Sequence, residues 1–482
     1  MNPLDPEVCR RARLARDHRF DGEFFLAVKT TGIYCRPVCP ARPPREDNVT
    51  YYRSAAEAAQ AGFRPCLRCR PESAPMSPAW LGTDTTLKRA LGMIHEGYLN
   101  DHSLGQLADR LGVGERYLRK LFQQKLGVAP STVAQTQRLH FAQKLLLETS
   151  IPITQVAFSS GFGSLRRFNS ATREAFGCAA SELRRRPQSV NPGTGVQMTL
   201  GYRPPMDADG LVNFFSRHAV EGIESVNEGV YRRNLRTTHG VARVAIDLYP
   251  ANRNQGNQHT FNLELSLSDN RDLMSAVAQL RRMFDLDAQP GDISGSLAED
   301  AQLGSLAREC PGVRSPVYAS PFEACVRAVL GQQVSTVAAR RLCAAIVAAA
   351  DDRVPDAGEP VLVFPSPQSL SRVPDSVLKM PASRRNTLRA VCECFATVDA
   401  GDSAAILEHL AGVKGIGPWT LALLAMRGYG DPDCFPESDL GLVKAAAACG
   451  INSRGELRRR SAHWQPWRSY AANLLWRSIS NG

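Results

Sequence analysis

The sequence lacks any run of about 18 to 20 uncharged apolar residues, the length that a membrane-spanning helix requires. Its first residues, MNPLDPEVCRRARLARD, are charged where a secretory signal would be apolar. It also lacks low-complexity tracts, and its 43% hydrophobic and 22% charged residues are close to the globular average, which excludes a disordered or fibrous protein. We therefore expect a folded cytoplasmic protein without membrane association.

The chain also lacks the cysteine density of a disulfide-stapled protein, because its 13 cysteines, an odd number, are spread over 482 residues. This length is roughly two to four times that of a usual domain and predicts about three domains. Two stretches rich in Pro, Gly, Ser and Asn, 71–82 and 186–197, are predicted linkers. They divide the chain into predicted domains at 1–74, 83–187 and 197–482.

Negative charge is scarce in the first two fifths of the chain. Residues 1–190 hold 28 Lys and Arg against 17 Asp and Glu, whereas residues 191–482 hold 30 of each kind. The whole net charge of +11 therefore lies in the first two predicted domains. A basic block of folded composition favours a nucleic acid as partner, although charge alone leaves a generally solvated surface open.

Four cysteines of the first predicted domain form two close pairs, Cys35 with Cys39 and Cys66 with Cys69. Two such pairs can place four thiolates at the corners of a tetrahedron, which is the arrangement of a structural zinc site. A redox pair and unrelated buried thiols are the alternatives. Because a domain this short needs a staple, we predict one zinc ion held by all four cysteines.

The run from FDGEFFLAVKTTGIYCRPVCPARPPREDNVTYY to AGFRPCLRCRP resembles the amino-terminal domain of the Ada DNA-repair family nearly end to end. The resemblance implies a small zinc-stapled α/β domain in which Cys35 is both a zinc ligand and a nucleophile. In that family this cysteine irreversibly takes a methyl group from a DNA methylphosphotriester. A zinc-held thiolate stays ionised and nucleophilic at neutral pH, which suits such a transfer.

Methyl transfer would also change the charge of the site. Four thiolates around one Zn(II) leave two net negative charges, and methylation of one thiolate removes one of them. Repulsion of DNA phosphates then falls, so we expect DNA affinity to rise and the protein to act once, as a sensor that activates alkylation-repair genes. Arg45 and Arg64 are candidate phosphate contacts, for which a solvated surface role stays open.

The middle predicted domain contains SLGQLADRLGVGERYLRKLFQQKLG, whose helix, glycine turn and helix are typical of a helix-turn-helix, with a plain helical hairpin as the alternative. A second copy, ITQVAFSSGFGSLRRFNSATREAFG, would let two units enter successive major grooves of DNA. The run GFGSLRRFNSATREAFG resembles the AraC-type DNA-binding domain, which implies an all-α double helix-turn-helix. Leu165 and Phe168 are predicted core residues. The predicted DNA contacts are Arg116, Tyr117, Arg119, Lys120, Ser164, Arg166, Arg167 and Asn169.

In the third predicted domain, HGVARVAIDLYP and HTFNLELSLS alternate apolar and polar residues, which predicts an antiparallel sheet within 197–270 and a helical bundle over 271–482. The sequence VKGIG places Gly415 and Gly417 in a tight hairpin between helices, where backbone N–H groups could bind a DNA phosphate. Asp439 follows on the Pro-flanked turn FPESDLG. A plain helix cap is the alternative for Asp439.

The runs FEACVRAVLGQQVSTVAARRL, KGIGPWTLALLAMRGYGDPDCFPESD and QPWRSYAANLLW resemble the AlkA type of helix-hairpin-helix DNA glycosylase, 3-methyladenine DNA glycosylase II. The resemblance implies that Asp439 is the catalytic carboxylate, which would stabilise positive charge as the N-glycosidic bond breaks. Trp419 and Trp476 match the pocket aromatics of that family. Electron-rich rings favour cationic bases such as 3-methyladenine and 7-methylguanine, and core packing is the alternative for both residues.

At several positions this sequence differs from related glycosylases, and the differences indicate which reactions to expect. Trp419 stands where strand-cleaving glycosylases place a lysine, so we expect a monofunctional enzyme. Near the carboxyl end Cys434 and Cys449 are too few for an iron–sulfur cluster, so none is expected. Leu423 replaces an expected pocket tyrosine, and Gln333 stands where the family inserts a leucine wedge, although Gln333 could still fill the space of the flipped base. The O6-methylguanine repair motif PCHR is absent, and we expect no such repair.

The sequence therefore predicts a multidomain α+β protein with a zinc-stapled domain, a double helix-turn-helix domain and a glycosylase. Its expected partners are alkylated and promoter duplex DNA and, when it acts as an activator, RNA polymerase. We expect a monomer associated with the nucleoid. Two alternatives stay open: a regulator whose third domain only binds DNA, and a repair enzyme whose first two domains only deliver it to DNA.

Overall fold

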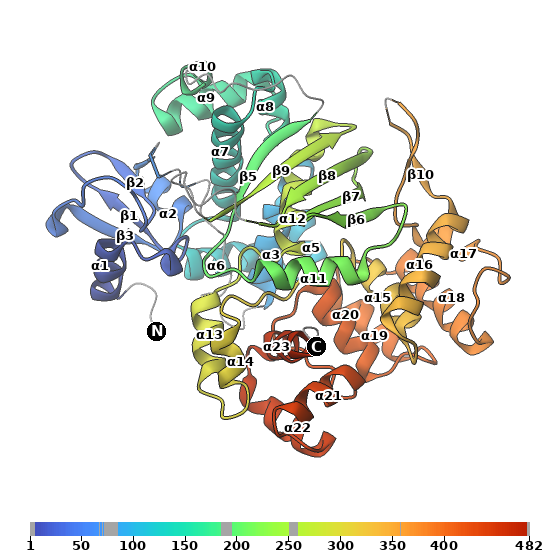
Figure 1. The fold of residues 1–482 in the computed structure, drawn as a ribbon. Coiled ribbons are helices and arrows are strands. Elements are labelled where there is room, and N and C mark those ends of the chain that lie inside the picture. The colour runs from blue at the N-terminus through green and yellow to red at the C-terminus, as the bar shows by residue number, and fades with distance from the viewer. Residues whose placement is uncertain are drawn as a thin grey trace.

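The computed structural model describes residues 5–66, 68–69, 71, 85–184, 195–249, 259–356 and 358–479. The predicted linkers, 71–82 and 186–197, lie almost wholly outside the described residues. Figure 1 shows a small first part beside the helices of the middle part, with a larger third part built from a sheet and a helical bundle. The prediction of a multidomain α+β protein is thereby confirmed.

The first part is built on a four-stranded sheet with the order β3-β1-β2-β4. All four residues of the central strand β1 are buried, because Phe25 and Ala27 pack toward α2 while Leu26 and Val28 pack toward the cysteines. The first described element is the helix α1, and the side chain of Asp5 caps its N-terminus. The elements are α1 (Pro6–Ala15), η1 (His18–Phe20), β1 (Phe25–Val28), β2 (Ile33–Cys35), η2 (Glu46–Asn48), β3 (Val49–Tyr52), α2 (Ala55–Gln60) and β4 (Arg64–Pro65).

The middle part is all helical, as its periodicity predicted. Ser103 and Gln106 form a capping box that starts α5, and Gly127 and Gly177, in left-handed conformation, end α6 and α9. The predicted core position Phe168 is fully buried and Leu165 is half-buried. The helices are α3 (Thr85–His95), α4 (Tyr98–Asp101), α5 (Leu104–Arg110), α6 (Glu115–Leu126), α7 (Pro130–Glu148), α8 (Ile153–Ser159), α9 (Leu165–Phe176) and α10 (Ala180–Leu183).

The third part begins with an antiparallel sheet in the order β5-β9-β8-β7-β6. Burial alternates along β5 and β7, so one face of the sheet packs on the core while the other is more open. The helix α11 (Ala208–His218) crosses between the first two strands in sequence. The strands are β5 (Val196–Gly201), β6 (Glu224–Asn227), β7 (Val230–Arg236), β8 (Val241–Asp247) and β9 (Thr260–Leu267).

A helical bundle follows the sheet, as predicted, except for one short strand pair, β10 (Arg353–Val354) with β11 (Val361–Leu362), which the sequence analysis missed. Two-residue strands leave too little alternation to be read from a pattern. The helices are η5 (Asn270–Asp272), α12 (Leu273–Met283), α13 (Pro290–Ala298), α14 (Gly304–Glu309), α15 (Pro321–Gly331), α16 (Thr336–Ala350), α17 (Pro367–Ser371), α18 (Ala382–Thr397), α19 (Ser403–Ala411), α20 (Pro418–Tyr429), α21 (Leu440–Ala448), α22 (Arg454–Ser461), η6 (Ala462–Trp464) and α23 (Arg468–Ser478). None of the described helices is both long and apolar enough to cross a membrane.

One hydrophobic cluster runs across the predicted boundary between the middle and third parts. It joins Phe141 and Leu145 of α7 to Leu200 of β5 and Leu265 of β9, all at most 7% exposed. Figure 1 shows α7 alongside this edge of the sheet. The second helix-turn-helix unit therefore packs on the third part as though both belonged to one domain.

Buried polar contacts fasten the first part to the other two. The Tyr34 hydroxyl lies 2.5 Å from Nε2 of His140 on α7. From the third part, the fully buried Arg203 donates through Nε to the carbonyl of Asp21 at 2.7 Å and forms an ion pair with Glu23 at 3.1 Å. These contacts fix how the three parts sit relative to one another.

Candidate metal centre and active site

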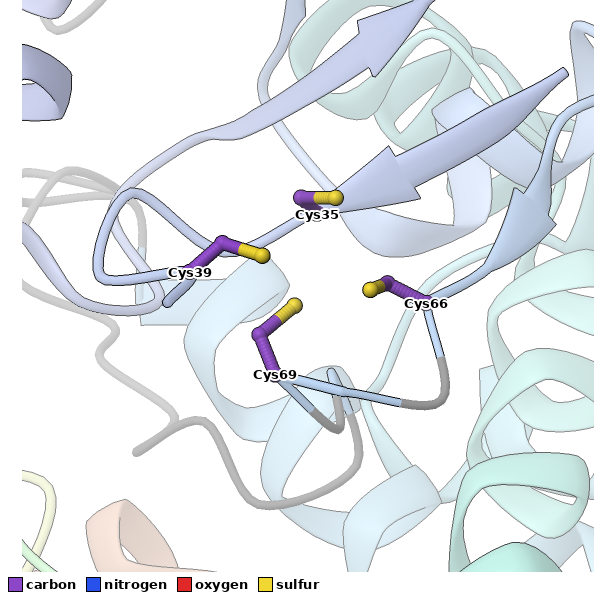
Figure 2. Close-up of side chains that lie close together, drawn as sticks. All are labelled: Cys35, Cys39, Cys66 and Cys69. Carbon is purple, nitrogen blue, oxygen red and sulfur yellow. The ribbon is translucent and has the colours of Figure 1, made fainter. Parts of the chain in front are cut away.

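The four cysteines of the first part lie together. Cys35 ends β2, Cys66 follows β4, and Cys39 and Cys69 lie in the loops after them. Their sulfur atoms all fall within 4.8 Å of one another and, in Figure 2, point toward a common centre. Zinc–sulfur bonds of about 2.3 Å imply a tetrahedron with edges of about 3.8 Å. The donor set and spacing therefore fit a zinc ion.

Hydrogen bonds connect the four thiols to one another and to the backbone. The backbone N–H of Arg36 donates to the Sγ of Cys69 at 3.3 Å. Hydrogen bonds among the thiols lower the pKa of Cys66 and Cys39 and raise the pKa of Cys35 and Cys69, so only part of the cluster is ionised by these bonds alone. Because thiolates this close repel one another, a divalent cation at their centre would stabilise all four in ionised form.

The predicted phosphate contacts of the first part differ in their surroundings. Arg45 is exposed and precedes η2. Arg64 is exposed too, but its guanidinium lies against Gly177 at the end of α9. Both stay predictions as DNA contacts.

The predicted DNA contacts of the middle part all lie on α6 and α9 or at the start of α9. Ser164 caps α9 by accepting from the backbone N–H of Arg167 at 3.3 Å. Arg119 pairs with Glu115 one turn earlier on α6 at 2.6 Å. Except for the half-buried cap residue, these side chains are exposed: Arg116, Tyr117, Arg119, Lys120, Arg166, Arg167 and Asn169. The second helix of each helix-turn-helix unit, α6 or α9, therefore presents a polar and basic face to solvent.

In the third part, Asp439 lies between the two predicted pocket tryptophans. The indole Nε1–H of Trp419 donates to Oδ2 at 3.0 Å, and the indole Nε1–H of Trp476 donates to Oδ1 at 3.0 Å. Asp439 also caps α21, because Oδ1 accepts from the backbone N–H of Leu442 at 2.9 Å. The helix-cap alternative is thus correct as local structure, yet the same carboxylate joins two indoles from separate helices.

The two predicted hairpin glycines occupy different environments. Gly415 has a φ of +93°, and a Cβ atom there would overlap the Oγ1 of Thr387. Gln332 donates to the Gly415 carbonyl at 2.9 Å, and Thr387 donates to the carbonyl of Lys414 at 2.8 Å. Gly417 caps α20, and nothing lies within 4 Å of a Cβ added there. The hairpin thus ends in a helix N-terminus whose first backbone N–H groups lack helical partners.

Gln333, the predicted wedge, lies between α15 and α16. It is exposed and has a φ of +56°, a conformation that costs a non-glycine residue free energy and often accompanies a functional role. Val334 and Val337 beside it are 41% and 50% exposed, which leaves an apolar surface next to the wedge position. Leu423, where a pocket tyrosine was expected, is half-buried on α20.

The sequence analysis missed Gly441, the second residue of α21. A Cβ atom there would lie 3.0 Å from Oδ1 of Asp439 and 3.3 Å from the indole of Trp476. Glycine therefore lets the indole approach the carboxylate closely. The only sequence signal was a glycine two residues after Asp439, at the start of a predicted helix.

Three families of domains match consecutive parts of the chain. The metal binding domain of Ada matches residues 8–72, a helix-turn-helix domain matches residues 107–186, and the AlkA N-terminal domain matches residues 197–320. These matches follow the order of parts that the sequence predicted.

Relatives match both the whole chain and its pieces. A protein of Mycobacterium tuberculosis called probable bifunctional transcriptional activator/DNA repair enzyme AlkA is 40% identical over 99% of this chain and 97% of its own length. DNA-3-methyladenine glycosylase 2 of Escherichia coli is 31% identical over 58% of this chain and 96% of its own length. The bifunctional transcriptional activator/DNA repair enzyme Ada of Escherichia coli is 35% identical over 36% of this chain and 47% of its own length.

Fold, site and matches together define a fusion of an Ada-type metal-binding domain, a helix-turn-helix domain and an AlkA-type glycosylase. The chain belongs to the family of the bifunctional transcriptional activator/DNA repair enzyme AlkA.

Proposed function

We propose that the third part is a monofunctional DNA glycosylase that hydrolyses the N-glycosidic bond of alkylated purines such as 3-methyladenine and 7-methylguanine. The observation that carries this proposal is the carboxylate of Asp439 held by indole N–H groups from Trp419 and Trp476, each at 3.0 Å. Such an arrangement fixes an anion beside aromatic surfaces, as excision of a cationic flipped base requires.

In this reaction Asp439 stabilises the positive charge that develops on the deoxyribose and orients the attacking water. Three donors, the two indoles and the Leu442 N–H, fix the carboxylate before the bond breaks, so no reorganisation is needed. Trp419 stands where a Schiff-base lysine would be required for strand cleavage. The product is therefore an abasic site in an intact strand.

We further propose that the first part holds one zinc ion through Cys35, Cys39, Cys66 and Cys69, and that Cys35 accepts a methyl group from a DNA methylphosphotriester. The four convergent sulfur atoms and the match to the metal binding domain of Ada support this proposal. When bound, zinc keeps the sulfur atoms ionised and nucleophilic. The Cys35 thiolate attacks the methyl carbon, the carbon–oxygen bond breaks, and a phosphodiester anion leaves.

The third element of the proposal is transcriptional activation by the methylated protein. The two exposed basic helix faces suit promoter DNA, and loss of one negative charge at the zinc centre raises affinity for phosphates. RNA polymerase is the proposed partner of the monomeric, nucleoid-associated protein.

One incubation with methylated duplex DNA tests both chemistries. Released bases are followed by chromatography, and the peptide containing Cys35 is weighed by mass spectrometry. We expect released alkylpurine together with a single added methyl on Cys35, and no methyl on the control thiol Cys178, which lies in the middle part. Methylated Cys35 without base release would leave a regulator with a DNA-binding third part, and base release with unmodified Cys35 would leave a glycosylase with a zinc-stapled arm.

A further inference from the structure

A buried arginine lies behind the carboxylate site. Arg427 is on α20, the helix that begins beside Trp419, and it is only 6% exposed. Within the part of the chain that the structure describes, no carboxylate forms an ion pair with its guanidinium, which instead donates to two neutral acceptors: the carbonyl of Pro316 at 2.7 Å and Oδ1 of Asn473 at 2.6 Å. Burying a cation without a paired carboxylate costs desolvation free energy, so the position of Arg427 suggests a functional role.

The guanidinium also contacts two aromatic rings. Its central carbon lies 4.6 Å from the ring centre of Phe214 and 5.2 Å from that of Trp476, both within cation–π range. Asn473 and Trp476 lie three residues apart on α23, so Arg427 holds this helix at the indole and at the turn before it. Burial lowers the pKa of Arg427 to about 10, and the group therefore remains a cation at neutral pH.

We propose that Arg427 is a positioning residue for base excision, which acts through Trp476 by fixing the indole so that its N–H reaches Oδ1 of Asp439. This inference rests on the proposed glycosylase function. The planar guanidinium combines a ring contact with two directed hydrogen bonds, which a lysine cannot reproduce. The indole is in turn held at its face by Arg427 and at its edge by Asp439.

A double-mutant cycle tests this dependence. Single-turnover release of 7-methylguanine from duplex DNA is measured for the wild type, Arg427→Met, Trp476→Phe and the double variant. Phenylalanine keeps a ring but lacks the N–H donor, and loss of a hydrogen bond to a charged group corresponds to a rate loss of about 10- to 100-fold. We expect each single variant to fall in this range and the double variant to be no slower than Trp476→Phe alone.

Trp419→Phe provides the matched control. The Trp419 indole also donates to Asp439, but among the described residues the aromatic rings within cation–π range of Arg427 are those of Phe214 and Trp476. The effects of Arg427→Met and Trp419→Phe should multiply. If the effects of Arg427→Met and Trp476→Phe also multiply, or if Arg427→Met keeps the wild-type rate, the inference is wrong. A wild-type protein that releases no base would overturn both the proposed function and this inference, whereas an active wild type with a multiplicative cycle overturns the inference alone.

Folding is monitored in the same experiment. Each variant is melted thermally, and its affinity for duplex DNA containing an abasic site is measured. If Arg427→Met does not fold, Arg427→Lys replaces it in the cycle, since it keeps the charge but not the fork. A purely structural role predicts that Arg427→Lys recovers the wild-type rate as it recovers stability. We expect instead a rate loss of about tenfold in a folded protein that binds abasic DNA normally.

Discussion

At the residue scale, the single side chain of Asp439 makes both structural contacts and the contacts of the proposed active site. Asp439 caps α21 through Oδ1 and meets an indole N–H at each oxygen. A suitable substitution can separate the helix-capping role of Asp439 from its proposed catalytic role. Asparagine caps a helix as well as aspartate does but carries no charge.

We expect Asp439→Asn to release alkylpurines at least about 100-fold more slowly than the wild type, because the anion that we propose stabilises the transition state is lost. The introduced amide keeps one acceptor oxygen for the cap, but its NH2 group replaces the other oxygen and faces an indole N–H, so the unfolding free energy should fall by about 1 to 3 kcal/mol. Asp439→Ala should lose about 1 kcal/mol more, because the cap is lost as well. Base release and thermal melting measure the two effects. Glu437→Gln, in the same loop, is the control and should release bases at the wild-type rate; a fast Asp439→Asn variant would contradict the assignment.

At the element scale, the hairpin before α20 shows how backbone geometry decides which glycine matters. Gly415 is in the left-handed region and faces Thr387, whereas Gly417 has a φ of −113° and open space beside it. The sequence VKGIG predicts a tight hairpin that contains both glycines. The backbone conformation of the folded hairpin and the contact of Gly415 with α18 distinguish them.

We expect Gly415→Ala to destabilise the protein by about 2 kcal/mol or more, since a left-handed alanine is strained and its Cβ overlaps the Thr387 hydroxyl. Its binding to abasic duplex DNA should weaken as the hairpin shifts. Gly417→Ala should change stability by less than about 1 kcal/mol. Urea unfolding and DNA titration of both variants check this contrast, and equal costs at the two positions would refute it.

At the scale of the whole molecule, the parts are joined by cores and buried polar contacts as well as by the chain. The cluster that contains Leu145 of α7 and Leu200 of β5 spans the middle and third parts, while Leu118 of α6 belongs to a separate cluster of the first helix-turn-helix unit. Figure 1 shows the second unit, α8 to α10, next to the end of the sheet. The helix α9, which we propose contacts DNA, is therefore held in a set orientation to the glycosylase part.

We expect Leu145→Ala to cost about 2 to 5 kcal/mol and to lower the temperature at which base release is lost, although Leu145 lies outside the glycosylase part. Leu118→Ala removes an equally buried leucine, yet it should destabilise the first unit without lowering that temperature. Residual base release after graded heating measures this difference. Identical heat-inactivation curves for both variants would contradict a shared core.

The junction between the first and middle parts should be sensitive to acid. Burial lowers the pKa of His140 to about 4, so the folded protein binds fewer protons than the unfolded chain between about pH 4 and 6.5. Stability from this neutral histidine is present above that window and is lost as the pH falls through it, about 2 kcal/mol by pH 5. Urea unfolding at pH 7 and pH 5 measures the loss, and His140→Gln should show a correspondingly smaller change.

Much of the fold was accessible from sequence because local patterns are strong in this chain. The alternation in HTFNLELSLS gave β9, and the apolar spacing around Phe168 gave the buried face of α9. The pairs of cysteines predicted a cluster whose sulfur atoms do converge. The β10–β11 pair and the role of Gly441 were missed, because they depend on short segments and on the position of a distant indole.

The sequence by itself determined the order of the three parts, the identity of the four thiol donors and the presence of an aspartate after a glycine hairpin, because these are local spacings of residues with distinct chemistry. Only the tertiary structure brought Trp419 and Trp476 to the two oxygens of Asp439 and placed the Arg427 guanidinium over the ring of Trp476. It also merged the second helix-turn-helix unit with the sheet. Such contacts join residues far apart in the chain, and packing selects them by shape, which no local pattern records.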